Sequence, residues 1–213
     1  MTPWRFLPVV GVGIALLVAR RDLLVRGIRW VDQQGGLASH HGEQAYAGVT
    51  RLFGGLHRRV AADAALAGAS VILDIGAGPG DVLQELRRLA PDASLIGVEP
   101  SERMRAIADS RGIREVAGRA ERLPVPDQSV DLVLSTLSSH HWDDPAAAFA
   151  EMGRVLGEGG EARIYDLRFA GFGPGEARRL AACAGLKPDS VTHRVVDERV
   201  FGLRPYSLIT IKR

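Results

Sequence analysis

VILDIGAGPGD, residues 71–81, is the stretch that decides the fold. Residues 71–74 read as a buried strand that ends in a carboxylate, and a helix is predicted to begin at Asp81. Glycines at positions 76, 78 and 80 fill the turn between the strand and the helix. Because only glycine lets the backbone come so close to a ligand at a helix N-terminus, the stretch predicts a cofactor-binding loop.

Two acidic residues, Asp74 and Asp81, flank this loop and favour a cationic ligand. A dinucleotide fingerprint needs a third glycine where this chain has Asp81, and a P-loop needs a Lys followed by Ser or Thr. Two carboxylates repel a pyrophosphate, but they tolerate an ammonium and a sulfonium. S-adenosylmethionine carries both of these charges, so it is the cofactor that we expect.

Another acidic residue, Glu99, ends the next strand-like run at residues 94–99. A carboxylate at this edge of a sheet can accept hydrogen bonds from two ribose hydroxyls. The alternative is that Glu99 only caps a helix that begins near Ser101. The glycine loop lies at the right distance in the sequence, and it favours the ribose interpretation.

Strand and helix patterns alternate from residue 70 onwards, which is typical of a parallel sheet with helices on both faces. Two final strand-like runs have no helix between them, so they must be antiparallel. The predicted fold class is therefore α/β: a Rossmann-like, doubly wound, seven-stranded and mostly parallel sheet with an antiparallel edge hairpin. Strands are predicted at residues 70–75, 94–99, 113–118, 130–136, 160–166, 191–200 and 206–212, and helices at 80–90, 101–111, 144–156 and 175–184.

The length of 213 residues fits one α/β domain with a short extension, and we assign residues 1–42 to the extension and 43–213 to the domain. The single cysteine, Cys183, excludes an internal disulfide and a cysteine-rich zinc site. It falls in a predicted helix and is expected to be a small core residue. His40 and His41 have no further ligand at a useful spacing, so no metal site is expected.

The N-terminal extension carries the basic charge of the chain. Residues 1–60 hold eight arginines against three acidic residues, whereas the remainder is net negative. Residues 6–19 are uncharged but shorter than the roughly 20 residues of a membrane span, and residues 21–31 form a basic amphipathic stretch. We therefore expect residues 6–31 to bind a membrane surface, with the domain on its cytoplasmic side. The alternative is that this stretch packs on protein.

The motifs along residues 43–213 are together similar, in order and spacing, to those of the class I S-adenosylmethionine-dependent methyltransferases. The resemblance is to the small-molecule group that includes the ubiquinone and menaquinone methyltransferases. It implies transfer of a methyl group to a small-molecule acceptor, and an antiparallel strand inserted at the sheet edge. The matching motifs are DIGAGPG at 74–80, GVEPS at 97–101, GRAERLPVPDQSVD at 118–131, LSTLSSHHW at 134–142 and EMGRVLGEGG at 151–160.

The resemblance also implies which residues contact the cofactor. At position 119 the family usually has an Asp that reads the adenine amino group, but this chain has Arg119. We expect Glu121 to take over that carboxylate role, with the backbone of Ala120 facing the adenine edge. The full set of expected cofactor contacts is Asp74, Gly76, Gly78, Gly80, Glu99, Pro100, Met104, Ala120, Glu121 and Ser135.

His140 and His141 follow the fourth predicted strand, at the edge where open α/β sheets bind their ligands. Imidazole titrates near neutral pH, so either residue is a candidate general base for an acceptor that loses a proton. The alternative is a structural role in holding the loop, and the sequence does not choose between the two histidines. Asp143 and Asp144 precede Pro145 and are expected to cap the next helix.

Two other functions compete with methyl transfer. Arg119 leaves open a non-catalytic module that only binds S-adenosylmethionine. A nucleotide-dependent oxidoreductase is opposed by the missing third glycine. Nucleic acid is not an expected partner. The run after the fourth strand lacks the two-proline motif of relatives that methylate the amino groups of bases. Methylation of a cytosine carbon needs a nucleophilic Cys in this loop, and Cys183 lies elsewhere.

Overall fold

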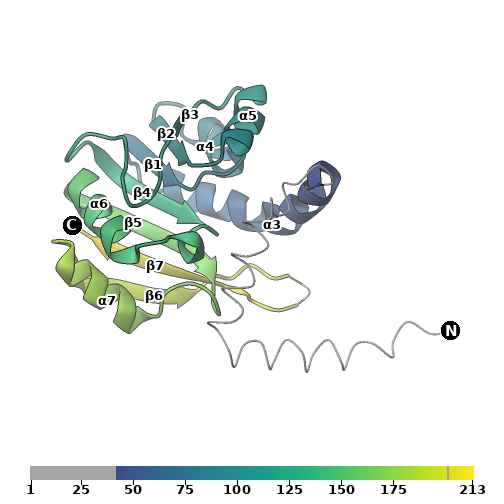
Figure 1. Ribbon diagram of the computed structural model, residues 1–213. Helices are drawn as coiled ribbons and strands as arrows, with labels where there is room; N and C mark the ends of the chain where they lie inside the picture. Colours follow the sequence, from purple (N-terminus) through teal and green to yellow (C-terminus); the bar gives the residue numbers. More distant parts are fainter. Residues whose placement is uncertain (1–41, 201) are drawn as a thin grey trace. The chain divides into compact units, whose positions relative to one another are not determined.

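The computed structural model describes residues 42–200 and 202–213 of the chain (Figure 1). The chain divides into two compact units, Met1–Ala47 and Gly48–Arg213, and the strands all belong to the second unit. The predictions made for residues 6–31 lie outside the described residues. The following description concerns residues 48–213.

The described strands form one seven-stranded sheet with the order β3-β2-β1-β4-β5-β7-β6. Neighbouring strands from β3 to β5 are parallel, whereas β7 is antiparallel to both β5 and β6. This arrangement confirms the predicted fold class. The strands are β1 (Val71–Ile75), β2 (Ser94–Glu99), β3 (Glu115–Ala117), β4 (Val130–Thr136), β5 (Leu156–Leu167), β6 (Lys187–Val195) and β7 (Tyr206–Lys212).

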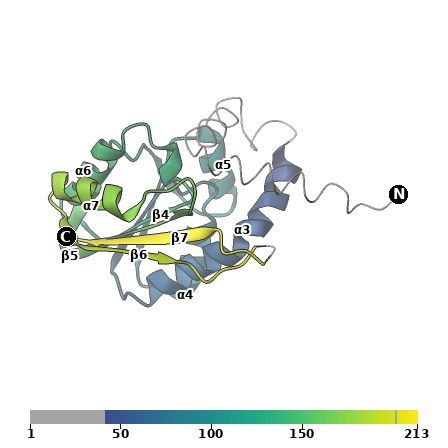
Figure 2. The same ribbon diagram turned by 90° about the horizontal axis from the view of Figure 1, so that it is seen from below.

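Helices cover both faces of the sheet, as Figure 2 shows with α6 and α7 on one side and α3 and α4 on the other. The side of α6 and α7 is filled by a core that includes Phe149, Met152 and Ile164. A second core includes Leu56 and Ile72 and packs α3 and α4 on the opposite face. The helices are α3 (Gly42–Ala65), α4 (Asp81–Leu89), α5 (Glu102–Ser110), α6 (Pro145–Val155) and α7 (Pro174–Cys183).

The strand order puts the site at the centre of the sheet. The chain runs outward from β1 to β2 and β3 and then crosses back to β4 on the other side of β1. At such a switch point in the strand order, open α/β sheets bind ligands in a crevice at the carboxyl ends of the strands, so we place the candidate site there. Asp74 lies at this point, paired in register with Gly97 on one side and Leu134 on the other.

Two sequence predictions differ from the structure. Cys183 is exposed and not part of the core. The buried face of α7 carries Ala177 and Ala181, and a residue two positions further on points to the opposite side of a helix. The sixth strand spans Lys187–Val195 rather than residues 191–200, because α7 ends at Cys183 and the chain enters the strand after the left-handed turn at Gly185.

Asp144 begins helix α6, as the sequence predicts. Its Oδ1 accepts hydrogen bonds from the backbone N–H groups of Ala146 (3.0 Å) and Ala147 (3.1 Å), and Pro145 occupies the first turn. Asp143 makes no such cap and instead pairs with Arg119. The capping role therefore belongs to Asp144 alone.

Replacing the capping residue, Asp144→Ala, should lower the free energy of unfolding by about 1 kcal/mol, because two backbone donors lose their acceptor. Urea titration followed by circular dichroism measures this change. Asp92→Ala, at an exposed position beyond α4, is the matched control and should stay close to wild type. Equal stability of the two variants would contradict the capping role.

Candidate cofactor and active site

The glycine turn after β1 requires glycine at two positions for two different reasons. Gly76 has φ +70°, and a Cβ atom there would lie 2.5 Å from the Cβ of Ser138 on the neighbouring loop. Gly80 is the N-cap of α4 in the left-handed conformation, with φ +79°. A larger residue would strain the backbone at either position. The turn therefore lets the backbone approach a ligand at the start of α4, as the sequence predicts.

Glu99 is fixed at the end of β2 by the loop itself. Its Oε2 accepts a hydrogen bond from the N–H of Gly78 (3.0 Å), and its Oε1 accepts one from the N–H of Ser101 (2.8 Å). The cap of α5 is the side chain of Ser101, which accepts from the N–H of Met104, so this role does not need Glu99. Each carboxylate oxygen keeps a second lone pair, and the two oxygens can therefore accept ribose hydroxyls.

Asp74 is a deeply buried charge that the described residues compensate only in part. Its side chain is 1% exposed, and its Oδ1 has no hydrogen-bond partner within the described part of the chain. Burial, and then the charges of Glu115 and Glu99, raise the pKa of Asp74 well above its usual value. Because a buried carboxylate without a partner is costly, a cationic group placed here would be bound favourably.

Asp81, the other acidic residue that flanks the loop, also has a buried oxygen, Oδ2, without a hydrogen-bond partner among the described residues, but its charge is paired. Its Oδ1 lies 2.7 Å from Nη1 of Arg111, and its Oδ2 lies 3.7 Å from Nδ1 of His57. The guanidinium already balances its charge. The preference of the loop for a cation therefore depends on Asp74 and not on both aspartates.

Glu115 is a functional candidate that the sequence analysis missed. It is the first residue of β3 and pairs in register with Gly97, and both of its carboxylate oxygens are buried without a partner among residues 42–200 and 202–213. A Cβ atom at Gly80 would lie 3.4 Å from its Oε1, so the carboxylate lies beneath the glycine turn. Burial and the charge of Glu99 raise the pKa of Glu115 to about 7. We call Asp74, Glu99 and Glu115 the carboxylate cluster.

Other orphaned polar atoms lie at the same edge of the sheet. Thr136 ends β4 and Tyr206 begins β7, and the hydroxyl of each is buried without a partner among the described residues. Burial and then the charge of Glu198 raise the pKa of Tyr206 to about 12. Unsatisfied donors and acceptors at the carboxyl ends of the strands are consistent with a site that a polar ligand completes.

The loop after β4 is tied closely to β1. The hydroxyl of Ser138 donates to the carbonyl oxygen of Ile75 (2.9 Å) and lies 2.8 Å from the hydroxyl of Ser135. Leu137 has φ +55°, an uncommon conformation for a leucine, and it turns the chain sharply after the strand. These contacts place the following residues, Ser139–His141, beside the glycine turn.

The structure distinguishes the two candidate histidines. Nδ1 of His140 lies 2.7 Å from Oδ1 of Asp166, and the two side chains are only 5% and 3% exposed. His141 is half-buried and packs its ring against that of His140, with 4.0 Å between the ring centroids. His140 is therefore the one that a carboxylate orients.

Asp166, at the end of β5, was not singled out in the sequence. Burial raises its pKa, but hydrogen bonds from His140 and Ser139 outweigh this effect and hold the pKa below the usual value. The only sequence signal was its position as the last residue of the predicted strand 160–166, an edge where ligands bind.

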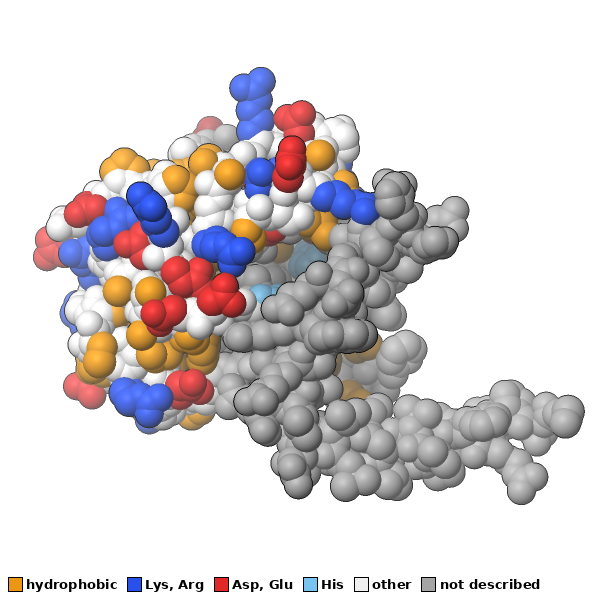
Figure 3. Space-filling model, in the orientation of Figure 1, with side chains coloured by type: hydrophobic (Ala, Val, Ile, Leu, Met, Phe, Trp, Pro, Cys, Tyr) orange, Lys and Arg blue, Asp and Glu red, His pale blue; other side chains and the backbone are white. Residues whose placement is uncertain are grey.

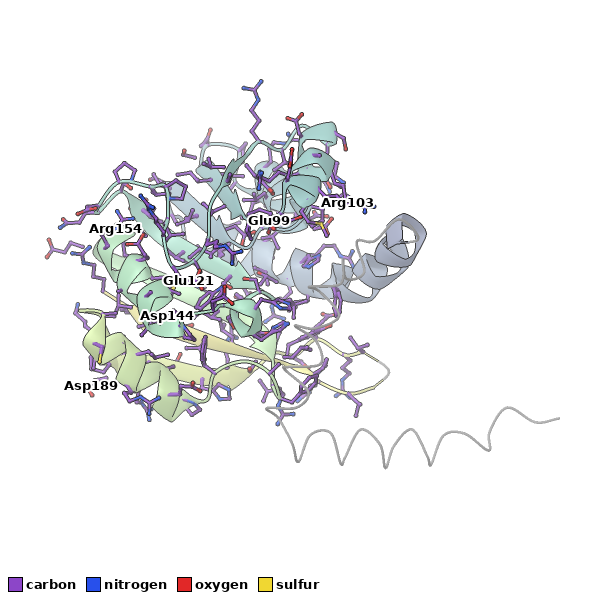
Figure 4. The ribbon with its side chains drawn as sticks, viewed as in Figure 1. Glu99, Arg103, Glu121, Asp144, Arg154 and Asp189 are labelled. Carbon is purple, nitrogen blue, oxygen red and sulfur yellow. The ribbon has the colours of Figure 1, made fainter. Side chains whose placement is uncertain are left out.

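The loop after β3 contacts the start of α6. Arg119 pairs with Asp143 (3.1 Å), and Oε1 of Glu121 accepts hydrogen bonds from the N–H groups of Asp143 (2.8 Å) and Asp144 (3.3 Å). Figure 4 shows Glu121 beside Asp144, with Glu99 at the end of β2. The proposed adenine contact of Glu121 thus involves a carboxylate that already binds α6, and it stays a prediction.

The remaining predicted contacts lie around the same crevice. Ala120 is buried on the loop after β3, Pro100 is exposed directly after Glu99, and Met104 is half-buried in the first turn of α5. The carboxyl ends of β1, β2 and β4 thus bring together Asp74, the three glycines, Glu99 and Ser135.

Basic and acidic side chains are intermixed on the face that Figure 3 shows, and neither sign forms a continuous patch there. Among the described residues, no group of three or more His, Cys, Asp or Glu is arranged to hold a metal ion. A search of the same residues finds no helix with the length and apolar character of a membrane span.

Comparisons with known proteins agree with this site. Residues 73–164 match the methyltransferase domain family. The chain is 33% identical over 97 residues to the uncharacterized methyltransferase YdaC of Bacillus subtilis, which covers 44% of this chain and 54% of that protein. It is 35% identical over 118 residues to a demethylmenaquinone methyltransferase of Deinococcus radiodurans, which covers 53% of this chain and 49% of that protein. The chain spans about half the length of these curated relatives.

A solved structure gives the same result for the fold. It is a SAM-dependent methyltransferase from Thermotoga maritima, described as a possible histamine N-methyltransferase, with 25% identity and a TM-score of 0.56. The match covers 80% of this chain and 96% of that one. Together the comparisons agree with the methyltransferase resemblance and with the cofactor that the sequence predicts.

Glu115→Gln should make the protein more stable at alkaline pH. The Glu pKa is 4.5 in the unfolded chain and about 7 in the fold, so the folded state disfavours the ionised form. The neutral Glu115 carboxyl therefore contributes its full stabilisation below about pH 4.5, and this stabilisation is lost as the pH rises through 7. Because solvent reaches the half-buried side chain and screens part of the cost, we expect a gain of about 1–2 kcal/mol at pH 8.

Urea titrations at pH 5 and pH 8 measure this difference, most of which should appear between the two values. Glu158→Gln, at an exposed position, is the control and should show no such pH dependence. A constant difference between Glu115→Gln and wild type at both pH values would contradict the assignment.

Proposed function

We propose, on the premise that the chain belongs to the class I S-adenosylmethionine-dependent methyltransferases, that it transfers a methyl group to a small-molecule acceptor. The observation that carries this proposal is the buried carboxylate of Asp74 before the three-glycine turn, with an Oδ1 that has no hydrogen-bond partner among the described residues. Glu99, hydrogen-bonded to the same turn, supplies the second recognition group.

We expect the site to recognise the cofactor in two ways, by the charge of Asp74 and by hydrogen bonds to Glu99. Asp74 receives positive charge, since burial makes its uncompensated carboxylate costly. Glu99 accepts the ribose hydroxyls, held in position by the N–H groups of Gly78 and Ser101. The glycine turn lets the backbone at the start of α4 approach the ligand. When bound, S-adenosylmethionine supplies a methyl group that its sulfonium already activates.

The protein then contributes position and a proton acceptor. Asp74 and Glu99 would hold the cofactor so that its activated methyl group could pass to a suitably placed acceptor atom. Where that acceptor atom carries a proton, a base has to remove it. His140 is our candidate for this base because a buried carboxylate orients it, with His141 stacked against it.

We further propose that the acceptor is apolar or lipid-like. Support comes from the basic amphipathic pattern of residues 21–31 beside the apolar run of residues 6–19. A relative that covers 53% of this chain carries the name demethylmenaquinone methyltransferase, which is the name of an enzyme with an apolar acceptor.

The cofactor proposal is tested by isothermal titration of the full chain with S-adenosylmethionine. Glu99→Gln should weaken binding about 10- to 100-fold, as expected for the loss of hydrogen bonds to a charged group. Glu158→Gln should bind as wild type does, and thermal melts show that both variants fold. If Glu99→Gln retains full affinity, or a phosphate-bearing ligand co-purifies instead, the cofactor site is wrong.

Turnover is tested separately, by following release of S-adenosylhomocysteine with lipid and quinone extracts as acceptors. Tight binding of S-adenosylmethionine without turnover would favour a non-catalytic binding module.

The acceptor proposal is tested by sedimentation with vesicles that contain anionic lipid. The full chain should sediment with them at low salt, and a variant without residues 1–32 should not. Neutral vesicles are the control. If the full chain ignores anionic vesicles, the lipid-like acceptor loses its support while the cofactor site is unaffected.

A further inference from the structure

We propose that Asp166 is a positioning residue for methyl transfer, which fixes the tautomer and ring orientation of His140 so that Nε2 receives the proton of the acceptor. This inference rests on the proposed function, because it gives His140 its chemical partner. It adds a residue from β5 to a site otherwise built from the ends of β1, β2 and β4.

The geometry around Asp166 sets the tautomer of His140. An ionised carboxylate only accepts hydrogen bonds, so Nδ1 of His140, 2.7 Å from Oδ1, must carry the proton. In the neutral ring the lone pair then lies on Nε2, the nitrogen that can take a proton. The same carboxylate accepts a second hydrogen bond from the backbone N–H of His140 (3.1 Å), which fixes the residue as well as its ring.

Asp166 is itself held rigidly. The hydroxyl of Ser139 donates to its Oδ2, and the N–H of Leu167 donates to its Oδ1 (2.7 Å). The loop after β5 packs against it so closely that a Cβ atom at Gly171 would lie 2.8 Å from its Cβ. With four donors and 2% exposure, the carboxylate has one orientation and little contact with water. A group held in this way transmits its own orientation to the imidazole.

The position of His140 relative to the cofactor loop supports a role in the reaction. Ser138, two residues before it, donates to the carbonyl of Ile75 and lies against Gly76. Strands β1, β4 and β5 are neighbours in the sheet, so their carboxyl ends form one edge. The loop that carries His140 is therefore anchored beside the glycine turn through Ser138, and its imidazole is held at β5 by Asp166.

The tautomer can be measured without an acceptor. Two-dimensional nitrogen-15 spectra of the full chain, with the His140 signals assigned from a His140→Gln variant, report which ring nitrogen carries the proton. Wild type should show the Nδ1–H form, and Asp166→Asn should shift the population toward the Nε2–H form, because the new amide can donate to Nδ1. An Nε2–H tautomer in the wild type would overturn the inference even if methyl transfer is confirmed.

The effect on catalysis is tested with an acceptor that the turnover screen provides. Asp166→Asn should lower kcat about 10²- to 10⁴-fold with little change in the Kd for S-adenosylmethionine. The double variant with His140→Gln should lose no more than His140→Gln alone, since the two residues act as a unit. Asp189→Asn, at an exposed position in β6, is the control and should leave kcat unchanged.

If Asp166 and His140 form a pair with only a structural role, the expected result is different. The Asp166→Asn variant would then be less stable, but its folded fraction would keep the kcat of the wild type, and this outcome would overturn the positioning role. Failure of the wild type to turn over any acceptor would instead count against the proposed function, and the tautomer measurement would still decide the geometry.

Discussion

The burial of the Asp74 carboxylate is the constraint on which the rest of the site depends. β1 is the strand at which the chain reverses its direction of growth across the sheet, so its carboxyl end is covered on both sides by neighbouring strands. A charge at this point loses its hydration, and no described donor replaces the water at Oδ1. The glycine turn that follows lets the backbone come close to a ligand that could compensate the charge.

The remaining contacts of the site keep this arrangement in place. Glu99 ties the glycine turn to β2 through Gly78, and Ser138 ties the loop after β4 to β1 through Ile75. Both contacts join a side chain on one loop to the backbone of another. The strands and the contacts between their loops therefore form the site together. The same contacts position His140, the candidate base.

The amino-acid pattern predicted most of the sheet because the relevant signals are local. The strands at 94–99, 130–136 and 206–212 match their predicted bounds, and the glycine turn lies between β1 and α4 as predicted. The sequence did not predict Glu115 and Asp166 as site residues, because their roles depend on pairing between strands far apart in the sequence. Glu115 becomes part of the cluster only when β3 pairs with β2 at Gly97, and Asp166 reaches His140 only when β5 lies beside β4. No local motif marks either residue.

Two buried acidic groups at the same sheet edge have opposite electrostatic environments, and the difference lies in their donors. Asp166 accepts four hydrogen bonds, so its pKa is lowered despite its burial and it stays ionised. The carboxylate cluster has fewer donors than charges, and the pKa values of Asp74, Glu99 and Glu115 are all raised. A charge that the protein has already compensated can orient a side chain permanently, whereas an uncompensated one gains most from a cationic ligand. The same edge of the sheet thus carries two kinds of charge: Asp166 orients a side chain, and the carboxylate cluster is available to bind a cationic ligand.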